Sequence, residues 1–229
     1  MKTINTHAIV LRRINYGEAD RIITVLSSEL GKVSVLAKGV RKLKSKLAGG
    51  IEPLAINEMT LIEGKKDLYT LRSARMERQM PNILSSIERS DQAFNALKQI
   101  NKLVEETEGK EFYQLLNIYL QSLNLGLELN IAETWWILRL LSILGHEPNL
   151  KTDAEGNDLR QNQNYVFNPE EGTFSPTELV AGKIFNSDHI KFWRLALQLQ
   201  PTKLVAIKSG KSLASDSAEQ LRLFQANQT

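Results

Sequence analysis

The first eighty residues carry the alternation of apolar and polar positions that is typical of β-strands. In the segment GKVSVLAKG, Val33, Val35 and Ala37 alternate with polar neighbours, which is the two-residue period of a half-buried strand. Four further runs are rich in β-branched and aromatic residues: THAIVLRR, DRIITVLSS, LAINEMTLIE and DLYTLRSAR. Five short strands in about seventy residues predict a small closed barrel, with the oligonucleotide-binding (OB) fold as one candidate.

From about residue 81 the apolar positions recur every three or four residues, which indicates amphipathic helices. The segment AETWWILRLLSILG is apolar nearly all round and predicts a buried central helix near residues 132–144, ending at Gly145. The long segment at about 146–175 has only a short candidate strand, YVF, and such long loops are uncommon inside compact domains. Helices are then expected from Pro176 to about Asn186, from Asp188 to about Leu199 and from Ser215 to Phe224.

These patterns predict an α+β protein of two modules, a β-barrel of residues 1–80 followed by an all-helical domain of residues 81–229.

Charge divides the chain in the same way. Residues 1–80 hold 15 Lys and Arg against 8 Asp and Glu, whereas the remainder holds 14 against 18. The balances of +7 and −4 sum to the net charge of +3. A basic first module is suited to a polyanion, most often a nucleic acid.

The positive charge is concentrated in one short stretch, AKGVRKLKSKLAGGIEPL, which begins at Ala37. It carries five cations and no acid between them: Lys38, Arg41, Lys42, Lys44 and Lys46. A loop of this kind can lay its charges along a phosphate backbone and release the condensed counterions. We expect it to be flexible before contact and ordered on contact. A loop that is merely solvated is the alternative, because most charge runs are.

Aromatic residues on which bases could stack are few in the first module. Tyr16 lies at a predicted turn and Tyr69 in a predicted strand, and either could equally belong to the core. A second, weaker basic row lies near the module boundary, at Arg72, Arg75 and Arg78.

Catalytic motifs are absent from the sequence. It contains no GxxxxGK[ST], GxGxxG or GxSxG, and its three histidines share no metal-ligand spacing. The lack of cysteine excludes disulfides, thiol nucleophiles and cysteine zinc sites, and it fits a cytoplasmic protein. No apolar run is long enough to span a bilayer, and a secretory signal is not expected. We therefore expect a non-catalytic protein that needs no metal or other cofactor.

The first module resembles the N-terminal barrel of the bacterial RecO family, the recombination mediators of DNA repair. Four pieces in order carry the resemblance: YGEAD (Tyr16–Asp20), ELGKV (Glu29–Val33), AKGVRKLKS (Ala37–Ser45) and a Gly-Gly-x-Glu-Pro turn (Gly49–Pro53). Later in the chain, ILGHEPNL (Ile143–Leu150) is similar to the Leu-Gly-x-x-Pro-x-Leu segment after that family's central helix. The resemblance covers most of the first eighty residues and, more loosely, the helical module.

This resemblance implies an OB-fold barrel, a helical domain, and a mediator associated with the nucleoid. Such a protein binds single- and double-stranded DNA, anneals complementary strands and, with RecR, helps to load RecA. The resemblance implies that DNA is contacted by Lys38, Arg41, Lys42, Lys44, Lys46, Arg12 and Arg13. It also implies binding of the acidic, apolar C-terminal tail of the single-stranded DNA-binding protein. Arg139 in the central helix is a candidate for the tail, and packing against an acidic helix is its alternative role.

One departure from the family concerns zinc. Many RecO proteins carry a four-cysteine zinc knob after the central helix, whereas here Asp153–Gly156 and Thr173–Pro176 stand where the cysteine pairs would fall. We expect a knob retained without its metal. The alternative function is an RNA-binding or ribosome-associated protein that uses the same basic barrel.

Overall fold

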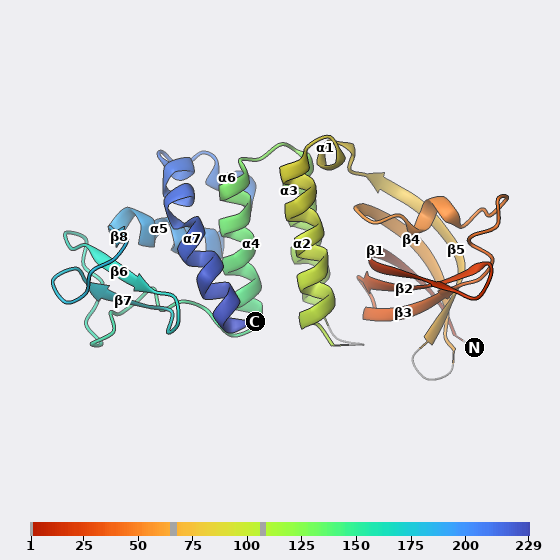
Figure 1. Cartoon of the computed structure of the whole chain (residues 1–229), viewed down its shortest axis with the longest axis horizontal. Helices are drawn as coiled ribbons and strands as arrows, with labels where there is room; N and C mark the ends of the chain where they lie inside the picture. The colour runs from red at the N-terminus through yellow and green to blue at the C-terminus, as the bar shows by residue number, and fades with distance from the viewer. Residues whose placement is uncertain (1, 65–67, 106–108) are drawn as a thin grey trace. The chain divides into compact units, whose positions relative to one another are not determined.

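The computed structural model describes residues 2–64, 68–105 and 109–229 (Figure 1). These residues form two compact units, which divide between Asn124 and Leu125. The first unit begins with five strands: β1 (Thr3–Tyr16), β2 (Asp20–Ser27), β3 (Gly31–Ala37), β4 (Ala55–Ile62) and β5 (Leu68–Gln79). The fifth strand was expected to include Asp67, which lies outside the described residues.

The five strands close into a barrel in the order β1-β2-β3-β5-β4. The long strand β1 pairs with β4 through its first half and with β2 through its second half. The pairing of β3 with β5 is parallel, and the other pairs are antiparallel. This arrangement confirms the predicted N-terminal OB-fold barrel.

Apolar residues that alternate along the strands fill the barrel, because successive side chains of a strand point to opposite faces. Val33, Val35 and Ala37 face inward as their alternation predicts, and each is at most 2% exposed. They meet the inward residues of the other strands, among them Val10, Ile23, Met59, Leu61 and Leu71.

Three helices of the same unit follow, α1 (Pro81–Leu84), α2 (Ile87–Leu103) and α3 (Lys110–Asn124). Of these, α2 and α3 cover part of the outer surface of the barrel, and α1 packs against both. Ile9 and Leu26 face outward opposite each other, yet both are fully buried. The Lys32 ammonium of β3 donates to the carbonyl oxygens of Asn101 (2.9 Å) and Val104, so a cation holds the C-terminus of α2. The first compact unit therefore continues beyond residue 80, where the barrel itself ends.

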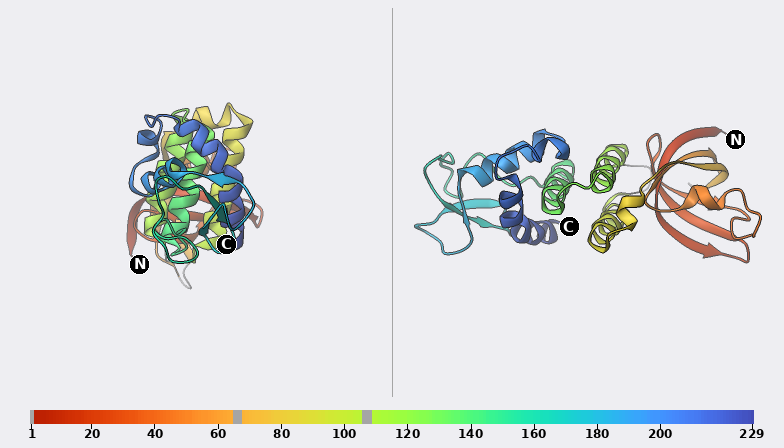
Figure 2. Two further views of the ribbon diagram at one scale, coloured as in Figure 1. Left: turned by 90° about the vertical axis from the view of Figure 1, so that its left-hand side faces the viewer. Right: turned by 90° about the horizontal axis from the view of Figure 1, so that it is seen from above.

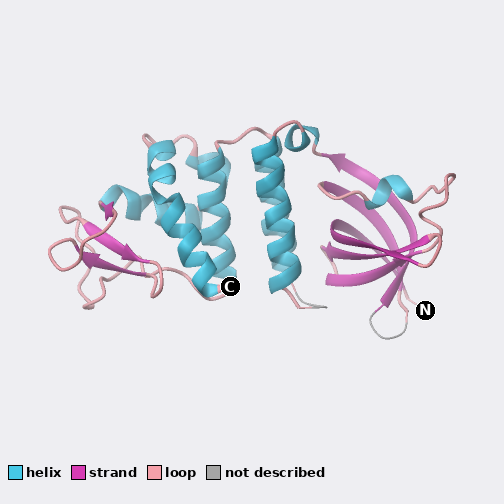
Figure 3. Cartoon of the chain, viewed as in Figure 1, coloured by secondary structure: helices cyan, strands magenta, loops and turns pink. Residues whose placement is uncertain are grey.

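The second unit contains α4 (Leu129–Ile143), α5 (Ser187–Gln198), α6 (Pro201–Leu204) and α7 (Gly210–Gln228), shown in cyan in Figure 3. The predicted central helix is confirmed as α4, which is buried nearly all round and is followed by Gly145 with φ +80°. The helix predicted from Asp188 is confirmed as α5. The last helix begins at Gly210, five residues before the predicted start, because Leu213 and Ala214 are buried in the unit.

A small sheet accompanies these helices, so the second unit is mainly but not wholly helical. Its strands are β6 (Tyr165–Asn168), β7 (Thr173–Pro176) and β8 (Ile184–Phe185), in the order β7-β6-β8. The short strand predicted at YVF is confirmed as β6. The helix predicted from Pro176 to Asn186 is wrong, because Phe185 pairs with Tyr165 and is fully buried beside Trp193 (ring centroids 5.6 Å apart). Aromatic packing overrides the helical pattern there.

Candidate nucleic-acid interface

The basic stretch forms the loop between β3 and β4, and its first end is fixed to the β1–β2 hairpin. Gly39 has φ +63°, which turns the chain out of β3. Its N–H donates to a carboxylate oxygen of Asp20 over 2.7 Å, and the Arg41 N–H donates to the Ala19 carbonyl over 2.9 Å. Between these bonds, the side chain of Val40 is 4% exposed and belongs to the barrel core.

The second end of the loop is fixed to β5. A short 3₁₀ helix, η1 (Ala48–Ile51), places Ile51 in the barrel core with no exposed surface. Gly50 lies so close to β5 that an added Cβ would stand 2.5 Å from the backbone carbonyl carbon of Ala74. Both ends of the loop are therefore anchored by buried side chains and close backbone contacts.

This loop carries all five of the predicted cations. Lys38, Arg41, Lys42, Lys44 and Lys46 are all exposed. Within the part of the chain that the structure describes, none of the five forms an ion pair. The Arg41 guanidinium donates to the Gly17 carbonyl over 3.1 Å, so one cation lies directly against the hairpin turn. In Figures 1 and 2 the loop and the hairpin lie at the end of the barrel away from α2 and α3.

Arg12 and Arg13 do not share one face. A register shift after Val10 pairs Arg12 with Thr24, which faces outward, and Arg13 with Ile23, which faces the barrel interior. Arg12 is exposed, and Arg13 forms an ion pair with Glu52 at 2.6 Å. The structure thus brings Arg12 to the outer surface and gives Arg13 a carboxylate partner.

The weaker candidates from the sequence differ in how accessible their side chains are to a ligand. Arg75 forms an ion pair with Glu58 across the β4–β5 pair at 2.8 Å. Tyr69 packs against the barrel core, whereas Tyr16 at the end of β1 is 55% exposed. Only Tyr16 of these two tyrosines therefore offers a ring to a ligand.

Arg139 is half-buried in the second unit, where it contacts the neighbouring helix. Its guanidinium donates to the Leu197 carbonyl over 2.6 Å, in the last turn of α5. A cation at this position satisfies a carbonyl of the helix C-terminus and is favoured by the helix dipole. A role for Arg139 in binding a partner stays a prediction.

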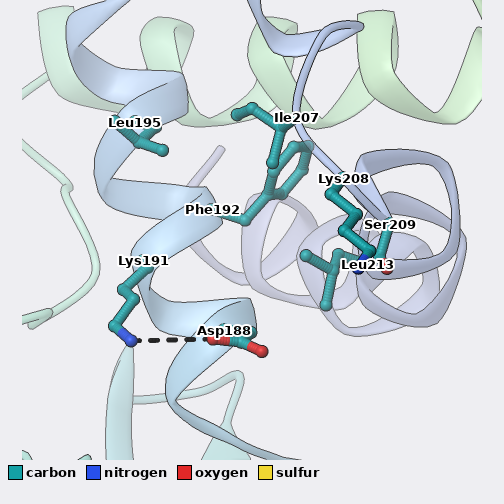
Figure 4. Close-up of a pocket in the computed structure, with 8 residues that line it drawn as sticks. All are labelled: Asp188, Lys191, Phe192, Leu195, Ile207, Lys208, Ser209 and Leu213. Atoms are coloured by element: carbon teal, nitrogen blue, oxygen red, sulfur yellow. Dashed lines mark ion pairs between the residues drawn. The ribbon is translucent and has the colours of Figure 1, made fainter.

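A pocket of about 430 Å³ lies between α5 and the start of α7, and sequence reasoning missed it. Figure 4 shows the side chains that line it: Asp188, Lys191, Phe192, Leu195, Ile207, Lys208, Ser209 and Leu213. The apolar side chains form its walls, and Lys191, which pairs with Asp188 at 3.6 Å, and Lys208 lie at its edge. No motif could indicate this pocket, since its residues come from two segments that only the fold brings together.

The segment at about 146–175 contains a defined turn at Asp153. The carboxylate of Asp153, which is 5% exposed, accepts the N–H groups of Glu155 (3.0 Å) and Asn157 (2.8 Å). Among the described residues, no group of three or more His, Asp or Glu side chains could hold a metal ion. No helix in the same described ranges is long and apolar enough to cross a membrane.

Comparison with known proteins agrees with this architecture. Residues 1–80, which end just after β5, match the family model "Recombination protein O N terminal". DNA repair protein RecO of Acetivibrio thermocellus is 36% identical over 153 residues, covering 65% of this chain and 59% of that protein. RecO of Roseiflexus sp. is 33% identical over 219 residues, covering 95% of this chain and 72% of that protein.

A third relative, RecO of Dehalococcoides mccartyi, is 33% identical over 168 residues, covering 73% of this chain and 66% of that protein. The chain thus spans between 59% and 72% of the length of these three relatives. The identity extends over both the barrel and the helical part, and the family model covers the whole barrel. The chain therefore belongs to the RecO family of DNA repair proteins.

Proposed function

We propose that this protein is a non-catalytic mediator of recombinational DNA repair that holds DNA on the β3–β4 loop. In this role it binds single- and double-stranded DNA, anneals complementary strands and, with RecR, helps to load RecA. The observation that carries the proposal is the set of five exposed cations, without acidic partners in the described structure, on a loop anchored at both ends. Association with the nucleoid would follow from DNA binding.

Electrostatics explains how such a loop could promote annealing. Each phosphate that a lysine or arginine neutralises releases condensed counterions, which favours binding without reading any base. Two complementary strands repel each other less when part of their charge is neutralised, so they can approach closely enough to pair. The anchored loop ends keep the cations together, which lowers the cost of ordering them on contact.

We also propose that the second unit contains the binding site for a protein partner. The tail of the single-stranded DNA-binding protein is acidic and apolar, and the pocket between α5 and α7 offers apolar walls with Lys191 and Lys208 at the edge. We propose this pocket, rather than the contact made by Arg139, as the place where such a tail binds. Anisotropy of a labelled peptide with an acidic stretch and an apolar C-terminus, measured on wild type and Lys191→Ala/Lys208→Ala, tests it.

The DNA-binding proposal is tested by fluorescence anisotropy of a labelled single strand over a salt series. The variant Lys42→Ala/Lys44→Ala/Lys46→Ala should lower the log-log salt slope by about two units if the loop holds about three phosphates. A matched control removes three exposed lysines from helices α2 and α3, namely Lys98, Lys102 and Lys110. This control has the same net charge as the loop variant and should keep a slope close to that of wild type.

An unchanged slope in the loop variant would contradict the proposal. An equal decrease of the salt slope in the two variants would mean that net charge, and not the loop, governs binding. Competition between DNA and RNA strands of matched sequence distinguishes the proposed function from the alternative one. A clear preference for RNA would favour an RNA-binding protein. We expect DNA to compete at least as well as RNA.

A further inference from the structure

The outer surface of β1, β2 and β3 is built in cross-strand rows, because directly paired residues of neighbouring strands point to the same face. The first outward row is formed by Ile9 and Leu26, and the next row is formed by Arg12 and Thr24. Further along the hairpin come Ile14 with Ile22 and Leu36, and then Tyr16 with Asp20. The inward residues between these rows, such as Ile23 and Val35, belong to the barrel core.

Coverage by α2 and α3 ends after the first row. Ile9 and Leu26 are fully buried, whereas Ile14 is 44% exposed and Tyr16 is 55% exposed. An isoleucine and an aromatic ring two positions apart on one strand are about 7 Å apart along it and point to the same side. The hairpin thus presents two adjacent apolar side chains to solvent.

Positive charge lies on both sides of this apolar pair. Arg12 precedes Ile14 on the same outer face and is exposed. Beyond Tyr16, the carboxylate of its cross-strand partner Asp20 holds the Gly39 N–H, which places Lys38 and Arg41 next to the hairpin end. Arg41 also donates to the Gly17 carbonyl, one residue after Tyr16. A ligand on Ile14 and Tyr16 would therefore meet cations at either end.

We infer that this face, with Tyr16 as its central residue, stacks the bases of an unpaired nucleic-acid strand and makes the protein favour single strands over duplexes. The inference rests on the proposed function, since it assigns base contacts beside the loop that holds phosphates. An unpaired strand combines flat apolar bases with a regular row of phosphates, which matches apolar residues flanked by cations. A duplex keeps its bases stacked inside the helix and cannot offer them to Tyr16.

The role of Tyr16 is tested with three probes of equal length: an oligo(dT) strand, the same strand with abasic sites, and a duplex. Base–aromatic stacking predicts that Tyr16→Ala weakens oligo(dT) binding about tenfold and leaves the abasic strand and the duplex nearly unchanged. Tyr16→Phe, which keeps the ring, should bind oligo(dT) like wild type. The salt slope should stay the same in Tyr16→Ala because no charge is removed.

Two further variants distinguish a loss of base stacking from a general loss of exposed apolar surface and from a loss of phosphate contacts. Ile87→Ala removes a 77% exposed apolar side chain from α2 and should leave all three affinities unchanged. The loop variant Lys42→Ala/Lys44→Ala/Lys46→Ala should weaken binding of all three probes, which tests the proposed function separately. Equal effects of Tyr16→Ala on the oligo(dT) and abasic strands, or no effect on either, would overturn the stacking role while leaving the loop result valid.

Discussion

Gly49 and Gly50 are adjacent and chemically identical, yet only Gly50 lacks room for a side chain. An added Cβ at Gly50 would stand 2.5 Å from both the carbonyl carbon and the Cβ of Ala74, whereas one at Gly49 would meet nothing within 4 Å. Because backbone atoms of a barrel strand cannot move aside cheaply, the contact fixes how closely the basic loop returns to β5.

The glycine contact predicts different outcomes for two neighbouring substitutions. Gly50→Ala should lower the free energy of unfolding by about 2 kcal/mol through overpacking against β5. Gly49→Ala, the matched control, should change it by less than about 0.5 kcal/mol. Chemical denaturation followed by circular dichroism measures both, and equal stability of the two variants would show that the loop does not pack on β5 as described.

At the scale of elements, α4 and α5 are joined by a polar contact within a largely apolar interface. Arg139 is the half-buried cation of α4, and its guanidinium satisfies the Leu197 carbonyl in the last turn of α5. Its position therefore has a sufficient explanation in the fold of the second unit. A hydrogen bond of this charged kind contributes about 1.5–3 kcal/mol.

Substituting Arg139 distinguishes a role of this residue in stability from a role in partner binding. Arg139→Ala should lower the free energy of unfolding by about 1.5 kcal/mol, because the Leu197 carbonyl loses its donor. Lys203→Ala, an exposed control at the end of α6, should be neutral within about 0.5 kcal/mol. Under conditions where Arg139→Ala is folded, we expect its affinity for the acidic, apolar peptide to equal that of wild type, and a selective loss would instead place Arg139 in the peptide site.

At the scale of the whole molecule, the two proposed binding surfaces lie in different compact units. The five loop cations belong to the first compact unit, and the pocket with Lys191 and Lys208 belongs to the second. Sites that share no residues should respond independently to substitution.

This separation predicts a crossed pattern of affinities. Lys42→Ala/Lys44→Ala/Lys46→Ala should weaken DNA binding and leave the peptide affinity unchanged. Lys191→Ala/Lys208→Ala should weaken peptide binding by roughly tenfold and leave the DNA salt slope unchanged. Anisotropy titrations of both probes on both variants give the four values, and loss of both affinities in either variant would contradict two independent sites.

Much of this architecture follows from local sequence patterns. The two-residue alternation around Val33 and Val35 indicated the barrel strands, and the nearly continuous apolar run around Trp135 indicated the buried helix α4. The cations from Lys38 to Lys46 were also identified from sequence, because charge density in a short segment requires no knowledge of distant contacts.

The sequence by itself thus determined the strands of the first module, the buried helix α4 and the basic loop, each of which depends on residues close together in the chain. Only the tertiary structure decided which of Arg12 and Arg13 faces outward, since the register shift after Val10 is set by pairing with β2. It also decided that residues 176–186 form no helix, because Phe185 pairs with Tyr165 and packs against Phe167, both in the earlier strand β6. The exposure of Tyr16 was likewise a tertiary outcome, since it depends on where the helices of the first unit stop covering the sheet.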